Sequence, residues 1–186
     1  MVMRVTQAIT VTPDKVMLRD YNSEKPSLDI ESTVESDDDS GHVLEIYDYP
    51  ARCAEPADAE RLAKVLLDEV QAPRNMVQGE SGALTLLPGL RFTIEEHPYA
   101  PINQEYLVTS VHIEGGTPRL GATSEAKGKY RCRFEAMPSK HRYRPPRTHR
   151  AADMVGLQTT FTTGPPGKEI HSSGAGEVTV RYHWDR

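Results

Sequence analysis

The chain has few cysteines, few aromatic residues and no long hydrophobic run. It has 186 residues, of which 6% are aromatic, with one Trp, three Phe and two Cys. No apolar stretch approaches the roughly 20 residues that a membrane-spanning helix needs. Residues 1–6 contain no apolar run of the signal-peptide type, so we expect no signal peptide, although proteins exported outside the general secretory route share this property. Cys53 and Cys132 lie far apart, neither belongs to a C-x-x-C pair, and a disulfide between them has no support.

Motifs of enzymes and metal sites are also missing from the sequence. It contains no P-loop and no dinucleotide fingerprint, and residues 79–82 (Gly-Glu-Ser-Gly) lack the spacing of a nucleophile elbow. Residues 37–39 are three Asp without the alternate ligands and distal Glu of a calcium loop, so we interpret them as a solvated hairpin tip. None of the seven His forms H-x-x-x-H or H-E-x-x-H, which leaves a zinc site of loop histidines as the alternative. We therefore predict no enzyme activity and no catalytic, cofactor-binding or metal-ligating residues.

Charge is divided unevenly along the chain. Residues 1–125 carry 10 Lys and Arg against 22 Asp and Glu, a net −12, whereas residues 126–186 carry 12 against 5, a net +7. The composition, with 37% hydrophobic residues and a mean hydropathy of −0.57, is somewhat poor in core material. Such a split indicates two modules with different surfaces, or an acidic ring that contacts a basic neck in an assembly.

Most segments have the period-two alternation of β-strands. One segment alternates apolar with charged positions, its apolar members being Tyr130, Cys132, Phe134 and Ala136. We interpret Cys132 as a small core residue. A second long strand has one face marked by Leu107, Val111 and Ile113. Because one face of each strand is apolar and the other polar, antiparallel sheets or barrels are expected.

One helix interrupts the strands. From residue 56 to residue 72 apolar positions recur every three or four residues, which predicts an amphipathic helix. Pro56 suits its first turn and Pro73 ends it. The predicted fold class is therefore mainly β with one amphipathic helix (α+β).

The chain closes on a further strand. Val178, Val180, Tyr182 and Trp184 alternate with polar residues, which predicts a half-buried strand. We interpret Trp184 as core, with a surface contact to a neighbouring chain as the alternative. A strand that stops at its most hydrophobic residue predicts that the natural protein continues.

A Pro-rich basic segment precedes this end of the chain. We interpret residues 138–153 as a linker. Residues 140–150 are strongly basic with one aromatic, so the alternatives are a nucleic-acid contact and a semi-rigid neck that pairs with acidic neighbours.

Six stretches, in this order and spacing, resemble one known family. They are LRDYNSEKPSLD at 18–29, EYLVTSVH at 105–112, FEAMP with YRPPR at 134–147, GLQT at 156–159, GPPG at 164–167 and HWDR at 183–186. Together they resemble VgrG, the spike-tip proteins of bacterial type VI secretion systems, which are also known as Rhs-element Vgr proteins and are similar to the hub and spike of contractile phage tails. The resemblance extends from about residue 16 to the end of the chain.

The resemblance implies a domain organisation. Residues 1–138 correspond to the later part of a hub-type β-barrel domain, with the helix at about 56–72. Residues 139–154 correspond to a neck, and residues 155–186 to the start of an OB-fold with about two of its five strands. The chain is then expected to be a fragment of a longer protein that also has a trimeric β-helix needle.

The resemblance also implies partners and a location. The expected role is a homotrimeric adaptor between a tube of Hcp-like protein and the puncturing needle, carrying effector or tip proteins. It would be assembled in the bacterial cytoplasm and secreted through the type VI apparatus to the extracellular space or a target cell. No cofactor, nucleic acid or stable membrane insertion is expected. The alternatives are a contractile phage tail hub and, from another class, an OB-type oligonucleotide-binding module.

Overall fold

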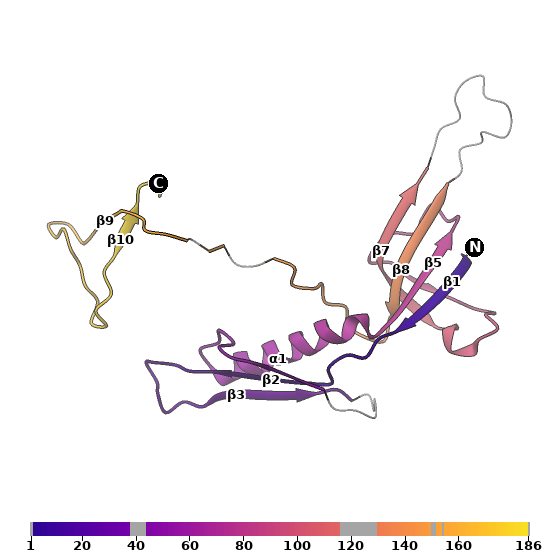
Figure 1. Cartoon of the computed structure of the whole chain (residues 1–186), viewed down its shortest axis with the longest axis horizontal. Coiled ribbons are helices and arrows are strands. Elements are labelled where there is room, and N and C mark those ends of the chain that lie inside the picture. Colours follow the sequence, from indigo (N-terminus) through magenta and orange to yellow (C-terminus); the bar gives the residue numbers. More distant parts are fainter. Residues whose placement is uncertain (1, 38–43, 116–129, 150–151, 154, 186) are drawn as a thin grey trace, which may run out of the picture. The chain divides into compact units, whose positions relative to one another are not determined.

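The computed structural model describes residues 2–37, 44–115, 130–149, 152–153 and 155–185. The chain divides into two compact units, Met1–Pro146 and Arg147–Arg186, and each is described by itself (Figure 1). The elements in chain order are β1 (Val2–Ile9), β2 (Lys15–Asp20), β3 (Ile30–Glu35), β4 (Glu45–Asp48), α1 (Pro56–Gln71), η1 (Ala72–Arg74), β5 (Asn75–Ser81), β6 (Arg91–Thr93), η2 (Ala100–Ile102), β7 (Glu105–Glu114), β8 (Arg131–Pro138), β9 (Thr160–Thr162) and β10 (Val180–Tyr182).

The larger sheet of the first unit has five strands in the order β1-β5-β8-β7-β6, and all neighbours are antiparallel. The alternation predicted for β8 is confirmed, because Cys132, Phe134 and Ala136 are buried. Phe134 and Ala136 pack with Val77 and Tyr106 into one apolar cluster. Cys132 lies on the same face of the strand. The other face of the sheet is polar, as period-two alternation requires.

A β-bulge makes one strand-face prediction wrong. The register between β7 and β8 shifts between Val108 and Ser110, so the side-chain alternation of β7 reverses there. Val111 therefore shares the core face with Val108, while Leu107 lies on the opposite face. The predicted apolar face of Leu107, Val111 and Ile113 assumed a regular strand. A single extra residue changes which side chains enter the core.

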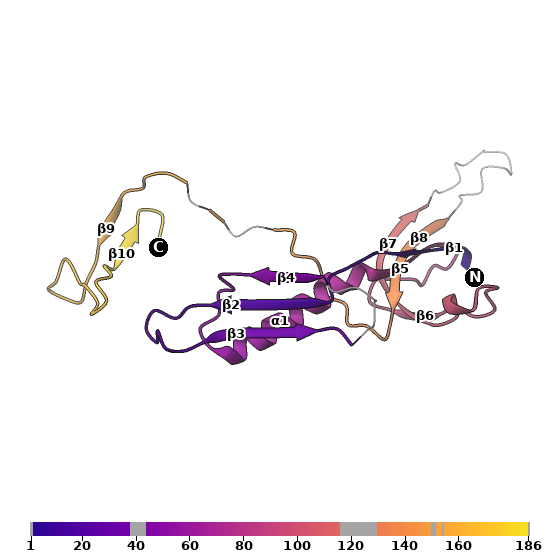
Figure 2. The same ribbon diagram turned by 60° about the horizontal axis from the view of Figure 1, so that its bottom comes forward.

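The smaller sheet has the order β3-β2-β4, with β2 antiparallel to β3 and parallel to β4. Helix α1 covers one face of it (Figure 2). Val16 and Leu18 of β2 pack against Ala63 and Leu66 of the helix. The predicted helix is present, with a Pro at its first turn, and the 3-10 turn η1 follows it directly.

Two chain passages join the two sheets of the first unit. One runs from β1 to β2 and the other is η1, which leads from α1 to β5. Thr10 donates its backbone N–H to the carbonyl of Arg74 at 2.9 Å. The Arg74 guanidinium lies 3.4 Å from the largely buried carboxylate of Asp14. The passages are therefore held to each other by backbone and side-chain contacts.

The second unit contains a two-stranded antiparallel sheet of β9 and β10. None of its described residues is buried. A two-stranded sheet is marginally stable at best by itself, so this unit needs further surface to pack against. The prediction that Trp184 is a core residue is wrong for the isolated chain, because its side chain is 64% exposed.

The mainly β class with a single α-helix is confirmed for the described residues. The hub-type barrel, the OB-fold and the domain boundaries at 138 and 154 stay predictions. Cys53 and Cys132 are both buried and free, and no described helix is long and apolar enough to cross a membrane.

Candidate assembly surfaces

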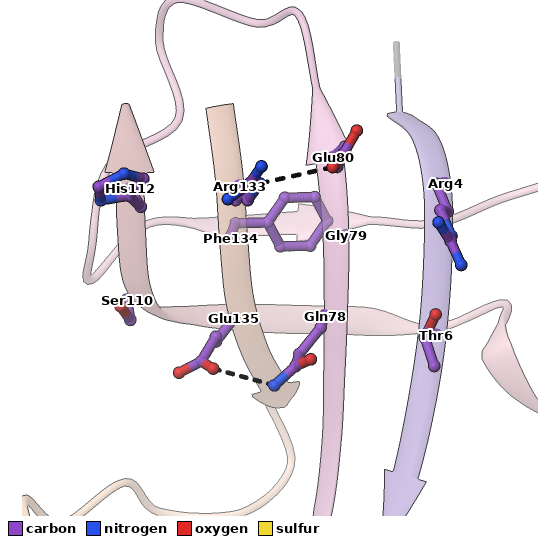
Figure 3. Close-up of a pocket in the computed structure, with 10 residues that line it drawn as sticks. All are labelled: Arg4, Thr6, Gln78, Gly79, Glu80, Ser110, His112, Arg133, Phe134 and Glu135. Atoms are coloured by element: carbon purple, nitrogen blue, oxygen red, sulfur yellow. Dashed lines mark hydrogen bonds and ion pairs between the residues drawn. The ribbon is translucent and has the colours of Figure 1, made fainter. Parts of the chain in front are cut away.

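The polar face of the five-stranded sheet carries two rows of side chains that cross four strands (Figure 3). In the first row Arg4, Glu80, Arg133 and His112 lie side by side on β1, β5, β8 and β7, and in the second row the members are Thr6, Gln78, Glu135 and Ser110. We call these eight residues the polar rows. They line a hollow of about 440 Å³.

Ion pairs and a hydrogen bond link members of the polar rows to one another and to Glu114. Arg133 Nε lies 3.5 Å from Glu80 Oε1, and its Nη1 lies 3.8 Å from Glu114 Oε1. Gln78 Nε2 donates to Glu135 Oε1 at 3.0 Å (Figure 3). Pairs this exposed contribute only about 0.2–1 kcal/mol each to stability. The first row, in which Arg4, Glu80 and Arg133 alternate in charge, is better suited to setting the register of a partner than to holding the fold together.

Gly79 permits the packing beneath the polar rows. Phe134 is its cross-strand partner, and a Cβ on Gly79 would lie 2.4 Å from Phe134 Cζ and 2.8 Å from the carbonyl oxygen of Arg4. The Phe134 ring meets the Phe92 ring edge-on, with centroids 5.2 Å apart. The glycine therefore lets the ring cross β5, and sequence reasoning missed this role because it depends on the neighbouring strand.

The basic segment that follows β8 starts on the first unit. Arg144 Nε lies 3.3 Å from Asp68 Oδ2 of α1, and both side chains are about one-third exposed. Lys140 and Arg142 are exposed, and no described residue forms an ion pair with either. The segment is thus anchored to the helix at Arg144, while Lys140 and Arg142 are directed to solvent.

The motif at residues 18–29 has a structural role in the first unit. Asp20 accepts backbone N–H donors of Cys53 at 2.9 Å and Tyr21 at 2.7 Å, and these bonds lower the pKa of the carboxyl. Asn22 Oδ1 accepts the backbone N–H of Glu24 at 2.9 Å, and its Nδ2 donates to the carbonyl of Ala54 at 3.2 Å. These bonds fix the turn after β2 to the segment before α1.

Burial raises the pKa of the Cys53 thiol, and the carboxylates of Asp20 and Asp58 raise it further. A raised thiol pKa disfavours the thiolate, which is the nucleophilic form. The geometry around Cys53 is therefore that of a structural core residue.

Aromatic side chains gather on the second unit. Tyr182 and Trp184 stack with ring centroids 4.9 Å apart, and Phe161 meets the His183 ring edge-on at 4.7 Å. His183 follows β10 in a turn rather than lying in the strand. Phe161, His183 and Trp184 are exposed and Tyr182 is half-buried, so this unit presents an aromatic surface where the alternating pattern predicted a core.

The excluded motifs can be placed as well. Within the described ranges no group of three or more His, Cys, Asp and Glu is arranged to hold a metal ion. His112 is exposed on β7, with Nε2 3.3 Å from Glu114 Oε1. Ser81 is buried at the end of β5, where its Oγ accepts the Ala83 N–H at 3.0 Å. Asp38, Asp39 and His42 lie outside the described residues.

Comparisons with known proteins give a consistent result. A family model described as phage tail baseplate hub (GPD) matches residues 1–118. The chain is 36% identical over 180 residues to the type VI secretion system spike protein VgrG4b of Pseudomonas aeruginosa, covering 90% of this chain and 22% of that protein. It is 33% identical over 183 residues to VgrG5 of the same organism, covering 92% and 23%. The actin cross-linking toxin VgrG1 of Vibrio cholerae is 25% identical over 177 residues, covering 92% and 16%.

A solved structure shares the fold. The 43 kDa tail protein of prophage MuSo2 from Shewanella oneidensis superposes with a TM-score of 0.54 at 11% identity, over 74% of this chain and 40% of that one. At this identity the likeness concerns the fold alone. The chain spans between about a fifth and a quarter of the length of VgrG4b and VgrG5.

Proposed function

Because the chain belongs to the phage tail baseplate hub (GPD) family, we propose that it is a structural part of a type VI secretion spike tip. In this proposal three copies form a hub that joins an Hcp-like tube to the puncturing needle. The spike is assembled in the bacterial cytoplasm and leaves through the secretion apparatus with effector or tip proteins. Residues 139–154 act as the neck, and residues 155–186 open an OB-fold.

The observation that carries the proposal is the agreement between the hub family match and the spike-protein relatives, which cover about nine-tenths of the chain. The structure adds physical support. The second unit has no buried residue among those described and exposes Trp184, as expected of a segment that packs on other surface in an assembly. The exposed polar rows offer a charged surface to neighbours.

The proposed role is mechanical and not enzymatic. One relative is named a toxin, but this chain covers only 16% of it. The contacts of Asp20, Cys53 and Ser81 hold turns and the core. Rigidity from sheet hydrogen bonding and large interfaces would then be the property under selection.

The test is mass by light scattering during size exclusion, on this chain and on a version extended through the OB-fold and needle. A mass of three times 20.8 kDa for this chain supports the proposal and shows that the hub carries its own assembly information. A monomeric chain with a trimeric extended form supports it with the needle driving assembly. Two monomers contradict the spike proposal.

A contractile phage tail hub is the second candidate, since the family name and the prophage tail protein both favour it. Neighbouring genes distinguish the two. Secretion tube and sheath genes support the type VI role, and capsid genes support the phage role.

An OB-type oligonucleotide-binding module is kept as a third candidate only because Trp184 and Phe161 are exposed. Salt-dependent binding of single-stranded DNA, lost on Trp184→Ala, would favour that module.

A further inference from the structure

The three-stranded sheet has one face that α1 does not cover. We call it the outer face, and its side chains are those of Lys15, Met17, Arg19, Glu31, Thr33, Glu35, Glu45 and Tyr47. The alternate residues of β2, Val16 and Leu18, point to the helix and are buried. Figure 2 shows the sheet with α1 on one side of it only. The outer face is therefore available for a partner.

Charges on the outer face leave a net negative surface. Lys15 Nζ lies 3.4 Å from Glu35 Oε1 and 4.0 Å from Glu45 Oε2. Arg19 lies 3.9 Å from Glu31 Oε2 and 4.0 Å from Asp29 Oδ1. Each cation is shared between two carboxylates, so each row retains one negative charge. Carboxylates held this way keep lone pairs for further donors.

Tyrosines surround one end of the outer face. Tyr21, Tyr47 and Tyr49 are 57%, 56% and 55% exposed, and with Pro26 they line a hollow of about 400 Å³ beside Arg19. Tyrosine presents a flat apolar ring with a polar tip, which is typical of protein interfaces. Aromatic grooves of this kind bind extended proline-containing peptides in the polyproline II conformation.

We propose that the outer face binds the basic neck, residues 139–149, of a second copy of the chain. This inference rests on the proposed trimer, which brings the second copy close. The segment carries the sequence SKHRYRPPRTH, so it supplies both the cations and the prolines that the outer face suits. Lys140 and Arg142 are exposed and form no ion pair with a described residue.

The acidic rows and the exposed cations of the neck can be compared in length. The two acidic rows are centred on Lys15 and Arg19, four residues apart on β2, which is about 13 Å at 3.3 Å per residue. A polyproline II segment rises about 3.1 Å per residue, so Lys140 and Arg142 are about 6 Å apart along it. One neck therefore brings both of these exposed cations to the acidic face together.

The neck must come from another copy and not from the same chain. Arg144 is anchored to Asp68 on α1, and α1 lies on the opposite face of the sheet from the acidic rows. Residues 139–146, held at Arg144, therefore lie away from the outer face of their own sheet. The chain is acidic up to residue 125 and basic after it. In this arrangement the basic part of one subunit pairs with the acidic part of another.

The experiment titrates a labelled synthetic peptide of residues 139–149 into the full chain and follows fluorescence anisotropy at several salt concentrations. The titrated chain carries Lys140→Gln and Arg142→Gln, so that necks of neighbouring copies do not occupy the face. We expect saturable binding below about 1 mM peptide, because a tethered neighbour supplies an effective concentration in the millimolar range. Binding should weaken as salt rises.

Two matched variants locate the site. Glu35→Gln with Glu45→Gln removes two carboxylates of the outer face. Glu24→Gln with Glu60→Gln removes two exposed carboxylates elsewhere, one in the connection between β2 and β3 and one on α1. The first pair should weaken peptide binding at least fivefold and the second less than twofold, with circular dichroism confirming that both fold. Absence of saturable binding at 1 mM, or equal affinity in both variants, overturns the docking proposal.

Mass by light scattering on the unsubstituted chain separates this inference from the hub proposal. A trimeric chain whose outer face binds no peptide overturns the docking and leaves the hub standing. Peptide binding to a chain that is monomeric even when extended supports the docking surface and contradicts the hub.

Discussion

Gly79→Ala tests whether the stability of the five-stranded sheet depends on the close packing of Phe134 over β5. The added Cβ would lie 2.4 Å from Phe134 Cζ, 2.7 Å from Cε1 and 2.8 Å from the Arg4 carbonyl oxygen. An ordinary contact is at least 3.4 Å, so the ring has to retreat by about 1 Å. Phe134 is 2% exposed and packs edge-on against Phe92, which leaves it little room.

Overpacking of this kind costs about 1–3 kcal/mol of unfolding free energy. In a chain of this length 1 kcal/mol corresponds to a shift in melting temperature of about 3 °C, so we expect a fall of about 3–9 °C. The assay is thermal unfolding followed by circular dichroism, with urea unfolding as a second measure of the free energy.

Gly82→Ala is the matched control. Gly82 lies three residues further along the chain, and a Cβ there meets no atom within 4 Å. This substitution should leave the melting temperature unchanged or raise it slightly, because alanine restricts the unfolded chain. If Gly79→Ala unfolds at the same temperature as Gly82→Ala, the close packing of Phe134 over β5 is refuted.

Three further outcomes are expected. Asp20→Asn should lower the melting temperature at pH 7, because the carboxylate accepts the Cys53 N–H. The hydrogen bond from Cys53 lowers the pKa of that carboxyl, so the stabilisation of the fold by its carboxylate is present above about pH 4. The difference in melting temperature between the variant and the unsubstituted chain should therefore disappear as the pH falls below about 4. A pH series of thermal melts measures this difference. Arg144→Ala should change the free energy of unfolding by less than about 1 kcal/mol, but it should release the neck from Asp68. Limited proteolysis should then cleave the chain after β8 faster than in the unsubstituted protein. Equal rates of cleavage would contradict the anchor. Trp184 should show the emission and acrylamide quenching of an exposed indole in this chain and become protected in the extended, assembled protein.

Regular elements with one clear apolar face were predictable from the sequence. The alternation around Phe134 gave the correct faces of β8 because that strand pairs without a bulge along most of its length. The period of three to four from residue 56 gave α1 because an amphipathic helix needs only local spacing to be recognised.

Features that depend on a neighbour were not predictable. The bulge near Val108 reverses the faces of β7, and nothing in the local pattern of Leu107 and Val111 reveals a residue without a cross-strand partner. The polar rows exist only once four strands are in register. Trp184 has the pattern of a core residue, but the described residues of this chain leave it 64% exposed.

The double passage between the two sheets has a mechanical consequence. β1 ends at Ile9 opposite Asn75, where β5 begins, so both connections leave the five-stranded sheet at the same end of neighbouring strands. The bond from Thr10 to Arg74 ties them together at that point. A tension that pulls the sheets apart would therefore act along β1 and β5 as one ribbon. The hydrogen bonds between β5 and β8 would be loaded in shear, so many of them must yield together before the ribbon slides.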